Sequence, residues 1–245
     1  MPFLIVSDIH ANLEALQAVL DDARGRYGSI LCLGDLVGYG ADPNAIVEWT
    51  RENVAVVIRG NHDRASAAED PSGFDTVETF NPIAQASTYW TRDALLPENR
   101  AYLETLPRGP LPYEGVDLVH GSPADEDEYV ITIADAAPLL AALETPLTFF
   151  GHTHKQGGFL RKRRMMGPLP AKGTLELEPD YFYLLNPGSV GQPRDGDPRA
   201  AYAVYSPEER TVEFRRVAYD VDRAAAKIRA AGLPDFLAAR LHEGL

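Results

Sequence analysis

The amino-terminal part of the chain alternates short apolar runs with amphipathic segments, a pattern typical of strands joined by helices. Apolar runs at 3–7, 29–33 and 54–58 each end in a polar loop. Between them, apolar positions at helical spacing predict helices over 12–24 and 42–53. Parallel strands joined by crossover helices bring the loops that follow the strands to one edge of the sheet. We therefore expect functional side chains at that edge.

Residues 64–115 interrupt this alternation. They predict a helical insertion over the site edge, with helices at about 79–95 and 97–106. Two further apolar runs follow, at 116–119 and 147–150, and each again ends in a histidine-bearing loop. These two runs are interpreted as further strands that lead to the same edge.

The last third of the chain has a different pattern. Segments at 174–185, 200–206 and 211–219 have hairpin-like spacing and predict a second, mostly antiparallel sheet. Residues 221–231 and 235–241 predict two closing helices. We expect residues 1–245 to form one domain that carries the helical insertion.

The composition excludes several classes of protein. With 45% hydrophobic and 24% charged residues, the chain is neither disordered nor collagen-like. The start lacks a basic segment and no apolar run reaches membrane-spanning length, so neither a signal peptide nor a membrane span is expected. Cys32, the single cysteine, suits a buried strand thiol, and a cytoplasmic location is predicted. The net charge of −13 disfavours stable binding to nucleic acids or anionic membranes.

Five of the six histidines directly follow predicted strands, and oxygen donors lie beside them. The histidines are His10, His62, His120, His152 and His154, and the oxygen donors are Asp8, Asp35, Asn61 and Asp63. Imidazole and carboxylate ligands together suit first-row divalent metals rather than calcium. One ion with open positions cannot use so many donors, whereas two ions that share a carboxylate can. The sequence therefore predicts a site for two metals.

Each motif by itself also has an ordinary structural explanation. An Asp-x-His sequence is common in loops, and Gly60-Asn61-His62-Asp63 is compatible with a simple turn. His-x-His sequences occur in surface loops as well. Turn chemistry does not explain why five histidines follow four separate strands, so the conjunction favours metal binding.

Five motifs in order resemble the calcineurin-like metallophosphoesterases. They are Asp8-Ile9-His10, Gly34-Asp35, Gly60-Asn61-His62-Asp63, His120-Gly121 and Gly151-His152-Thr153-His154. Residues 34–40 and 186–198 further resemble a small bacterial and archaeal branch with compact phosphodiesterases and proteins related to diadenosine tetraphosphatases. The resemblance implies the α+β class and a four-layer α-β-β-α sandwich of two mixed sheets.

The resemblance also implies a role for each ligand. Asp8, His10 and His154 would bind the first metal and Asp35 would bridge the two. Asn61, His120 and His152 would complete the second site. Manganese is the first expectation for both ions, with iron, zinc and nickel as alternatives.

A mechanism follows from two adjacent metals. Hydroxide held between them would attack phosphorus, since metal binding lowers the pKa of water. His62 would donate a proton to the leaving oxygen, and Asp63 would hold its imidazole in the protonated form or the correct tautomer. Arg194 would either grip phosphate or lie in a surface turn. Tyr39 would either line the pocket and stack on a base or pack within its loop.

The leading function hypothesis is hydrolysis of phosphodiester or phosphoanhydride bonds in small, nucleotide-like substrates. A phosphomonoesterase or serine/threonine phosphoprotein phosphatase would use the same metals. A non-catalytic interaction module is the alternative from another class, and the full set of predicted ligands argues against it. The oligomeric state stays open.

Overall fold

The structure, a computed structural model, describes residues 1–68 and 80–245. These residues form two six-stranded mixed sheets. The first sheet has the order β3-β2-β1-β11-β12-β9, in which β1, β2 and β3 are parallel and β11 joins β1 in antiparallel fashion. Its strands are β1 (Phe3–Val6), β2 (Ser29–Cys32), β3 (Val56–Val57), β9 (Thr174–Glu176), β11 (Ala200–Ser206) and β12 (Thr211–Val217).

The second sheet has the order β4-β5-β6-β10-β7-β8. Its centre is parallel, because β5, β6 and β10 run in one direction, and its outer strands are antiparallel to their neighbours. The strands are β4 (Leu111–Tyr113), β5 (Val116–Leu118), β6 (Leu147–Phe149), β7 (Gly157–Lys162), β8 (Met165–Pro170) and β10 (Tyr181–Asn186).

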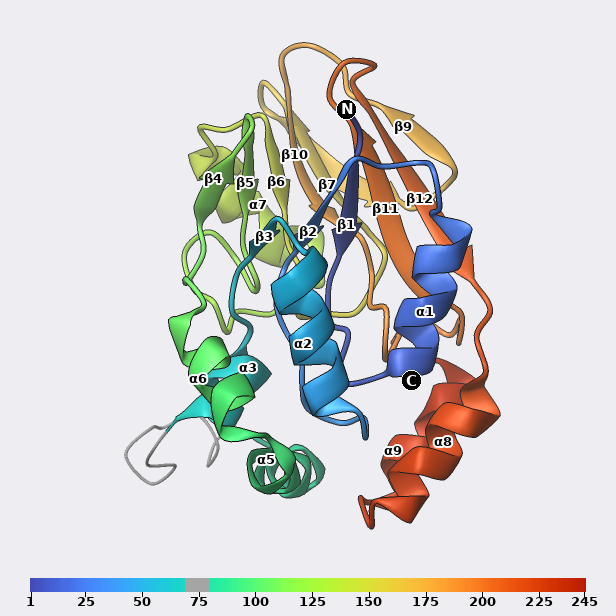
Figure 1. Ribbon diagram of the computed structural model, residues 1–245. Helices are drawn as coiled ribbons and strands as arrows, with labels where there is room; N and C mark the ends of the chain where they lie inside the picture. The colour runs from blue at the N-terminus through green and yellow to red at the C-terminus, as the bar shows by residue number, and fades with distance from the viewer. Residues whose placement is uncertain (69–79) are drawn as a thin grey trace.

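Side chains alternate along the central strands and so build two apolar layers. In β1, Leu4 and Val6 pack under the helices, whereas Ile5 lies between the two sheets. Helices α1 (Leu13–Asp22) and α2 (Pro43–Asn53) cover the outer face of the first sheet, and α7 (Ile133–Ala142) covers that of the second (Figure 1). The predicted four-layer α-β-β-α sandwich is confirmed.

Further helices gather beyond the carboxyl ends of the parallel strands (Figure 1). They are α3 (Asn61–Ala67), α5 (Pro82–Ala94), α6 (Pro97–Thr105), α8 (Val221–Ala230) and α9 (Asp235–Glu243). One apolar cluster joins α5, α8 and α9 through Ala84, Ile228 and Leu237, and it includes Tyr39. No helix among the described residues has both the length and the apolarity to cross a bilayer.

Asn12 ties the first helix to the loop that follows β10. Its side-chain oxygen accepts a hydrogen bond from the Ala15 amide at 3.1 Å and thereby caps α1. Its amide nitrogen donates to the Gly191 carbonyl at 2.8 Å. The loop at 186–198 is therefore fixed against the start of α1, next to the end of β1.

The structure corrects the expected sheet in the last third of the chain. The segments at 174–185, 200–206 and 211–219 do not form a sheet of their own. Strands β9, β11 and β12 extend the first sheet, and β10 enters the second. The reason is burial: residues 200–205 of β11 are all buried, so this strand needs neighbours on both sides and a layer on each face.

The helical insertion has narrower limits than predicted. Helices α5 and α6 lie where helices were expected, but residues 111–113 at its end form β4, which pairs with β5. Its beginning belongs to α3, which starts at Asn61. Residues 69–79 of the expected insertion lie outside the described residues.

Candidate metal centre

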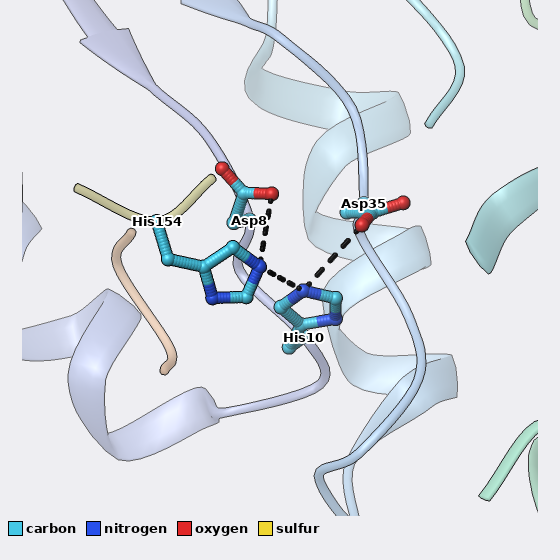
Figure 2. Close-up of side chains that lie close together, drawn as sticks. All are labelled: Asp8, His10, Asp35 and His154. Atoms are coloured by element: carbon cyan, nitrogen blue, oxygen red, sulfur yellow. Dashed lines mark hydrogen bonds and ion pairs between the residues drawn. The ribbon is translucent and has the colours of Figure 1, made fainter. Parts of the chain in front are cut away.

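Four buried side chains from three loops meet in a first cluster. Asp8 and His10 follow β1, Asp35 follows β2, and His154 follows β6, and their ligand atoms all lie within 4.8 Å of one another. The Nε2 atom of His154 is 3.3 Å from Asp8 Oδ1, and His10 Nε2 is 3.5 Å from Asp35 Oδ2. Figure 2 shows the four side chains pointing toward a common centre.

A second cluster lies on the other side of Asp35. Asp35, His120 and His152 also offer ligand atoms within 4.8 Å of one another. His120 Nε2 is 3.4 Å from Asp35 Oδ2 and 3.1 Å from Asn61 Oδ1. The structure thus brings together all seven predicted ligands, and Asp35 directs the same oxygen atom toward both clusters.

The backbone at these loops is held in an unusual conformation. Five of the seven predicted ligands have a positive φ: Asp8 (53°), His10 (49°), Asp35 (54°), His152 (63°) and His154 (58°). This region is unfavourable for residues other than glycine, and such strain is concentrated at functional sites. In these loops the unfavourable backbone conformation directs the side chains inward to a common point.

Backbone carbonyls set the tautomers of three histidines. In each, Nδ1 donates to a carbonyl oxygen: His10 to Val37 (2.9 Å), His120 to Leu33 (2.8 Å) and His154 to Gln192 (2.6 Å). Because a carbonyl only accepts, Nδ1 carries the proton, and in the neutral ring Nε2 presents a lone pair. The Nε2 atoms of His10 and His154 face each other at 3.1 Å. Two facing lone pairs repel unless a cation lies between them.

Two further atoms at this centre lack a partner. Asp8 Oδ2 and His152 Nε2 are buried and have no hydrogen bond among the described residues. An unsatisfied buried polar atom costs about 1–3 kcal/mol, and a bound cation removes that cost. Nitrogen and oxygen donors in this mixture suit first-row divalent metals. The residues present therefore fit a pair of divalent cations.

The pKa shifts at this centre show that its buried carboxylates need a positive charge nearby. Burial raises the pKa of Asp8 to about 7, and the neighbouring Asp35 carboxylate adds to the rise. Burial lowers the pKa of His120, but Asp35 outweighs it and raises that pKa to about 10. Burial lowers the pKa of His152 to about 3. Without a cation, protons on Asp8 and His120 supply the missing positive charge.

Metal binding is therefore expected to release protons. At pH 8 the proton of His120 must leave, and at pH 6 that of Asp8 must leave as well, because pH 6 lies below its pKa of about 7. For each proton that binding releases, the apparent affinity for Mn²⁺ increases about tenfold when the pH rises by one unit. Calorimetric titration of chelator-treated protein in buffers of different ionisation enthalpy measures the number released. Equal affinity at pH 6 and pH 8 would contradict this expectation.

Because Gly60 has no side chain, the Asp35 carboxylate can lie close to its Cα. A Cβ atom at this position would lie 2.1 Å from Asp35 Oδ1. We expect Gly60→Ala to displace Asp35 and to reduce bound Mn²⁺ to less than about half, because both clusters use this ligand. Metal analysis after gel filtration measures the change. Gly167→Ala is the matched control, since a Cβ there meets nothing within 4 Å, and equal metal content in the two variants would contradict the argument.

His62 lies in the wall of the site next to Asn61. Its Nε2 is 3.0 Å from the hydroxyl of Tyr39, and its backbone amide donates to Asp35 Oδ1 at 2.9 Å. Burial lowers the pKa of His62 to about 4, so the ring is neutral near pH 7 in the absence of substrate. Tyr39 thus contacts the imidazole directly, and it also lines the cavity beside it.

Asp63 does not hold the His62 imidazole, and that prediction is wrong. Its Oδ1 accepts from the amides of Leu36 (2.8 Å) and Val37 (3.2 Å), and Oδ2 accepts from the Gly60 amide at 3.0 Å. An acidic residue in the first turn of a helix readily accepts such bonds from backbone N–H groups. Asp63 is therefore a positioning residue that holds the Asp35 loop against the start of α3.

Two cavities share part of their lining, and the first of them is lined by two of the predicted ligands. The first, of about 370 Å³, is lined by side chains that include Asn61, His62, Phe80 and His152. The second, of about 630 Å³, includes the predicted substrate residue Arg194. Both are lined by Tyr39, Asn81 and Tyr129.

Sequence reasoning did not identify Tyr129, which is half exposed and lies against a predicted ligand. Its ring centroid is 3.9 Å from that of His152. It belongs to the loop after His120, and no motif or periodicity marks it. Only the spatial approach of that loop to His152 shows that Tyr129 lines the site.

Comparisons with known proteins agree with this geometry. The model of the calcineurin-like phosphoesterase superfamily domain matches residues 1–210. An uncharacterized protein of Methanocaldococcus jannaschii is 34% identical over 257 aligned residues, which cover 98% of this chain and 97% of that protein. The crystal structure of a metallophosphoesterase from Sphaerobacter thermophilus has 41% identity and a TM-score of 0.86, over 100% of this chain and 99% of that one. Hypothetical protein PH1004 from Pyrococcus horikoshii, at 21% identity and a TM-score of 0.81 over 100% and 98% of the two chains, shares the fold.

Proposed function

The chain belongs to the calcineurin-like phosphoesterase superfamily and is a metal-dependent phosphoester hydrolase, and we propose that its substrates are phosphodiesters or phosphoanhydrides of small nucleotides. The observation that carries the proposal is the position of Asp35, whose Oδ2 lies 3.5 Å from His10 Nε2 and 3.4 Å from His120 Nε2. One carboxylate oxygen therefore serves both clusters. This arrangement suits two divalent cations that share a ligand.

Asp8, His10 and His154 would hold one ion and Asn61, His120 and His152 the other, with Asp35 between them. Such ions, when bound, activate water and polarise the phosphoryl oxygens. Most of the ligands are neutral, which leaves the ions electrophilic. Mn²⁺ is the proposed native ion, because imidazole and carboxylate donors together accept it.

His62 is the proposed proton donor to the leaving oxygen, from Nε2. That atom now contacts the Tyr39 hydroxyl, which keeps the imidazole turned to the cavity wall. Burial lowers the pKa of His62 to about 4, and a phosphate bound beside it favours the protonated ring. With His62 as the proton donor, protonation of the leaving oxygen requires no second acidic side chain.

The charges around the first cavity favour a diester over a monoester. A dianionic monoester needs several cationic groups, but Arg64 in this wall is already paired with Glu126 and Asp127. Arg194 lies in the adjoining cavity and forms no ion pair with aspartate or glutamate within residues 1–68 and 80–245. The described wall of the first cavity therefore holds no unpaired arginine for the second negative charge of a monoester.

The test compares bis(p-nitrophenyl) phosphate with p-nitrophenyl phosphate, each with Mn²⁺ and with chelator. We expect Mn²⁺-dependent hydrolysis with kcat/KM at least about tenfold higher for the diester, a difference of about 1.4 kcal/mol. A preference for the monoester would favour the phosphatase alternative. If neither ester is hydrolysed by protein that has bound Mn²⁺, the catalytic proposal fails and the interaction-module alternative takes its place.

A further inference from the structure

Helix α9 supplies a charged wall to the second cavity. Phe236 and Arg240 from this helix line it together with Asn81 and Arg194. Helices α8 and α9 follow residue 210, where the match to the family model ends. The cavity is therefore completed by a segment that the family model does not describe.

Arg240 lines this cavity and forms no ion pair with an aspartate or glutamate side chain among the described residues. Its Nε donates to a main-chain oxygen of Leu245, the last residue of the sequence. By contrast, Arg223 and Arg229 of α8 pair with Glu14 and Asp235.

Arg194 lines the second cavity and is bonded to the backbone of a predicted ligand. Its backbone amide donates to the His154 carbonyl at 3.2 Å, and Gln192 Oε1 accepts from its Nε and Nη2 at 3.2 and 2.8 Å. Its guanidinium carbon lies 5.5 Å from the centroid of the Tyr39 ring. The Gln192 hydrogen bonds leave other N–H groups of this guanidinium for a ligand.

Arg194 and Arg240 line the same cavity, and like charges that share a cavity repel each other. Burial lowers the pKa of Arg240 to about 10, and the charge of Arg194 contributes to the decrease. Two cations that approach each other across a cavity form a site for an anion, because an anion removes their repulsion and accepts several N–H groups at once.

We propose that Arg194 and Arg240 bind a second phosphate group of the substrate, beyond the phosphate that is hydrolysed. This inference rests on the proposed function and narrows it to nucleotides that carry at least two phosphate groups. Tyr129 and Phe236, each 50% exposed, line the same cavity and offer apolar surface to a base.

The kinetic test uses two chromogenic diesters that differ by one phosphate: the 5′-(p-nitrophenyl phosphate) of thymidine and its 3′-phosphorylated form. For Arg240→Gln we expect KM to rise about tenfold to a hundredfold for the 3′-phosphorylated ester and less than about twofold for the other. Arg240→Lys keeps the charge, and we expect its KM for the 3′-phosphorylated ester to lie between those of the wild type and Arg240→Gln. Arg229→Gln on the same pair of helices is the matched control and should leave both KM values unchanged, since Arg229 pairs with Asp235 outside the cavity. Equal changes for both esters, or none, would overturn the proposal.

A binding measurement separates this proposal from the proposed function. Thymidine 3′,5′-bisphosphate is titrated calorimetrically into chelator-treated wild-type and Arg240→Gln protein, with thermal unfolding to verify that both are folded. We expect at least about tenfold weaker binding to the variant, even if neither ester is hydrolysed. Equal binding by the two folded proteins would overturn the second-phosphate site, whereas inactivity with intact binding would overturn only the proposed reaction.

Discussion

Asp35→Asn is expected to lower kcat/KM for bis(p-nitrophenyl) phosphate by more than about a thousandfold. Asp35 is the one side chain that belongs to both clusters, and its Oδ2 faces both His10 and His120. The substitution preserves shape and an oxygen that can accept from the His62 amide, but it removes the negative charge that two adjacent cations need. Loss of metal assistance removes several kcal/mol of transition-state stabilisation, which corresponds to at least this factor.

Metal analysis of the same variant shows whether the loss has the expected cause. We expect fewer than two Mn²⁺ ions per chain for Asp35→Asn, measured by elemental analysis after removal of excess metal. Asp21→Asn is the control, because Asp21 is an exposed partner of Arg24 far from the strand ends. An Asp35→Asn protein with two ions and wild-type activity would show that Asp35 is not the shared ligand.

His62→Asn is expected to lower kcat by about 10² to 10⁴, the usual contribution of a general acid. His62 lies against the first cavity and contacts the Tyr39 hydroxyl at 3.0 Å, but it is not one of the seven predicted ligands. Bound Mn²⁺ should therefore be unchanged. The loss should be largest for substrates with a poor leaving group, such as an alkoxide, and much smaller for p-nitrophenolate, which departs without a proton.

A purely structural role for His62 predicts a different outcome. If the imidazole only packs against Tyr39 and Phe80, the variant should lose the same factor for both leaving groups, and its thermal stability should fall in parallel. Tyr39→Phe is the matched comparison, because it removes the hydroxyl contact and keeps the ring. We expect it to change kcat by less than about tenfold, since it repositions the acid without removing it.

The clusters could be predicted from the sequence because each of their side chains follows closely after a short apolar run. Val6 ends β1 and Asp8 follows, and Cys32 ends β2 and Asp35 follows. Parallel strands then bring such loops to one edge without any knowledge of distant contacts. The resemblance to a known family supplied what local pattern could not, namely the two-sheet sandwich.

The sheet order could not be read from the sequence, because it depends on pairings between residues far apart. Hairpin spacing placed 200–206 with its neighbours in sequence, and β11 does pair with β12, but its other edge pairs with β1. Local spacing carries no information on that second partner. The same holds for β10, which pairs with β6 in the second sheet, whereas β9 and β11, its neighbours in sequence, lie in the first sheet.

The finer roles of side chains depended on geometry as well. Asp63 is adjacent to His62 in sequence, which suggested a contact with the imidazole, but in α3 its carboxylate turns back to backbone amides. Arg240 lies in a helix with no motif near it, and only the apolar cluster that joins α9 with α8, α5 and Tyr39 brings it to the cavity. Neither arrangement follows from composition or periodicity.

The most direct test of the central claim is a crystal structure of the protein grown with Mn²⁺, with anomalous scattering measured at the manganese edge. We expect two peaks per chain, one among Asp8, His10 and His154 and one among Asn61, His120 and His152, with Asp35 bound to both. A single peak, or two peaks that do not share Asp35, in crystals saturated with Mn²⁺ would contradict this expectation.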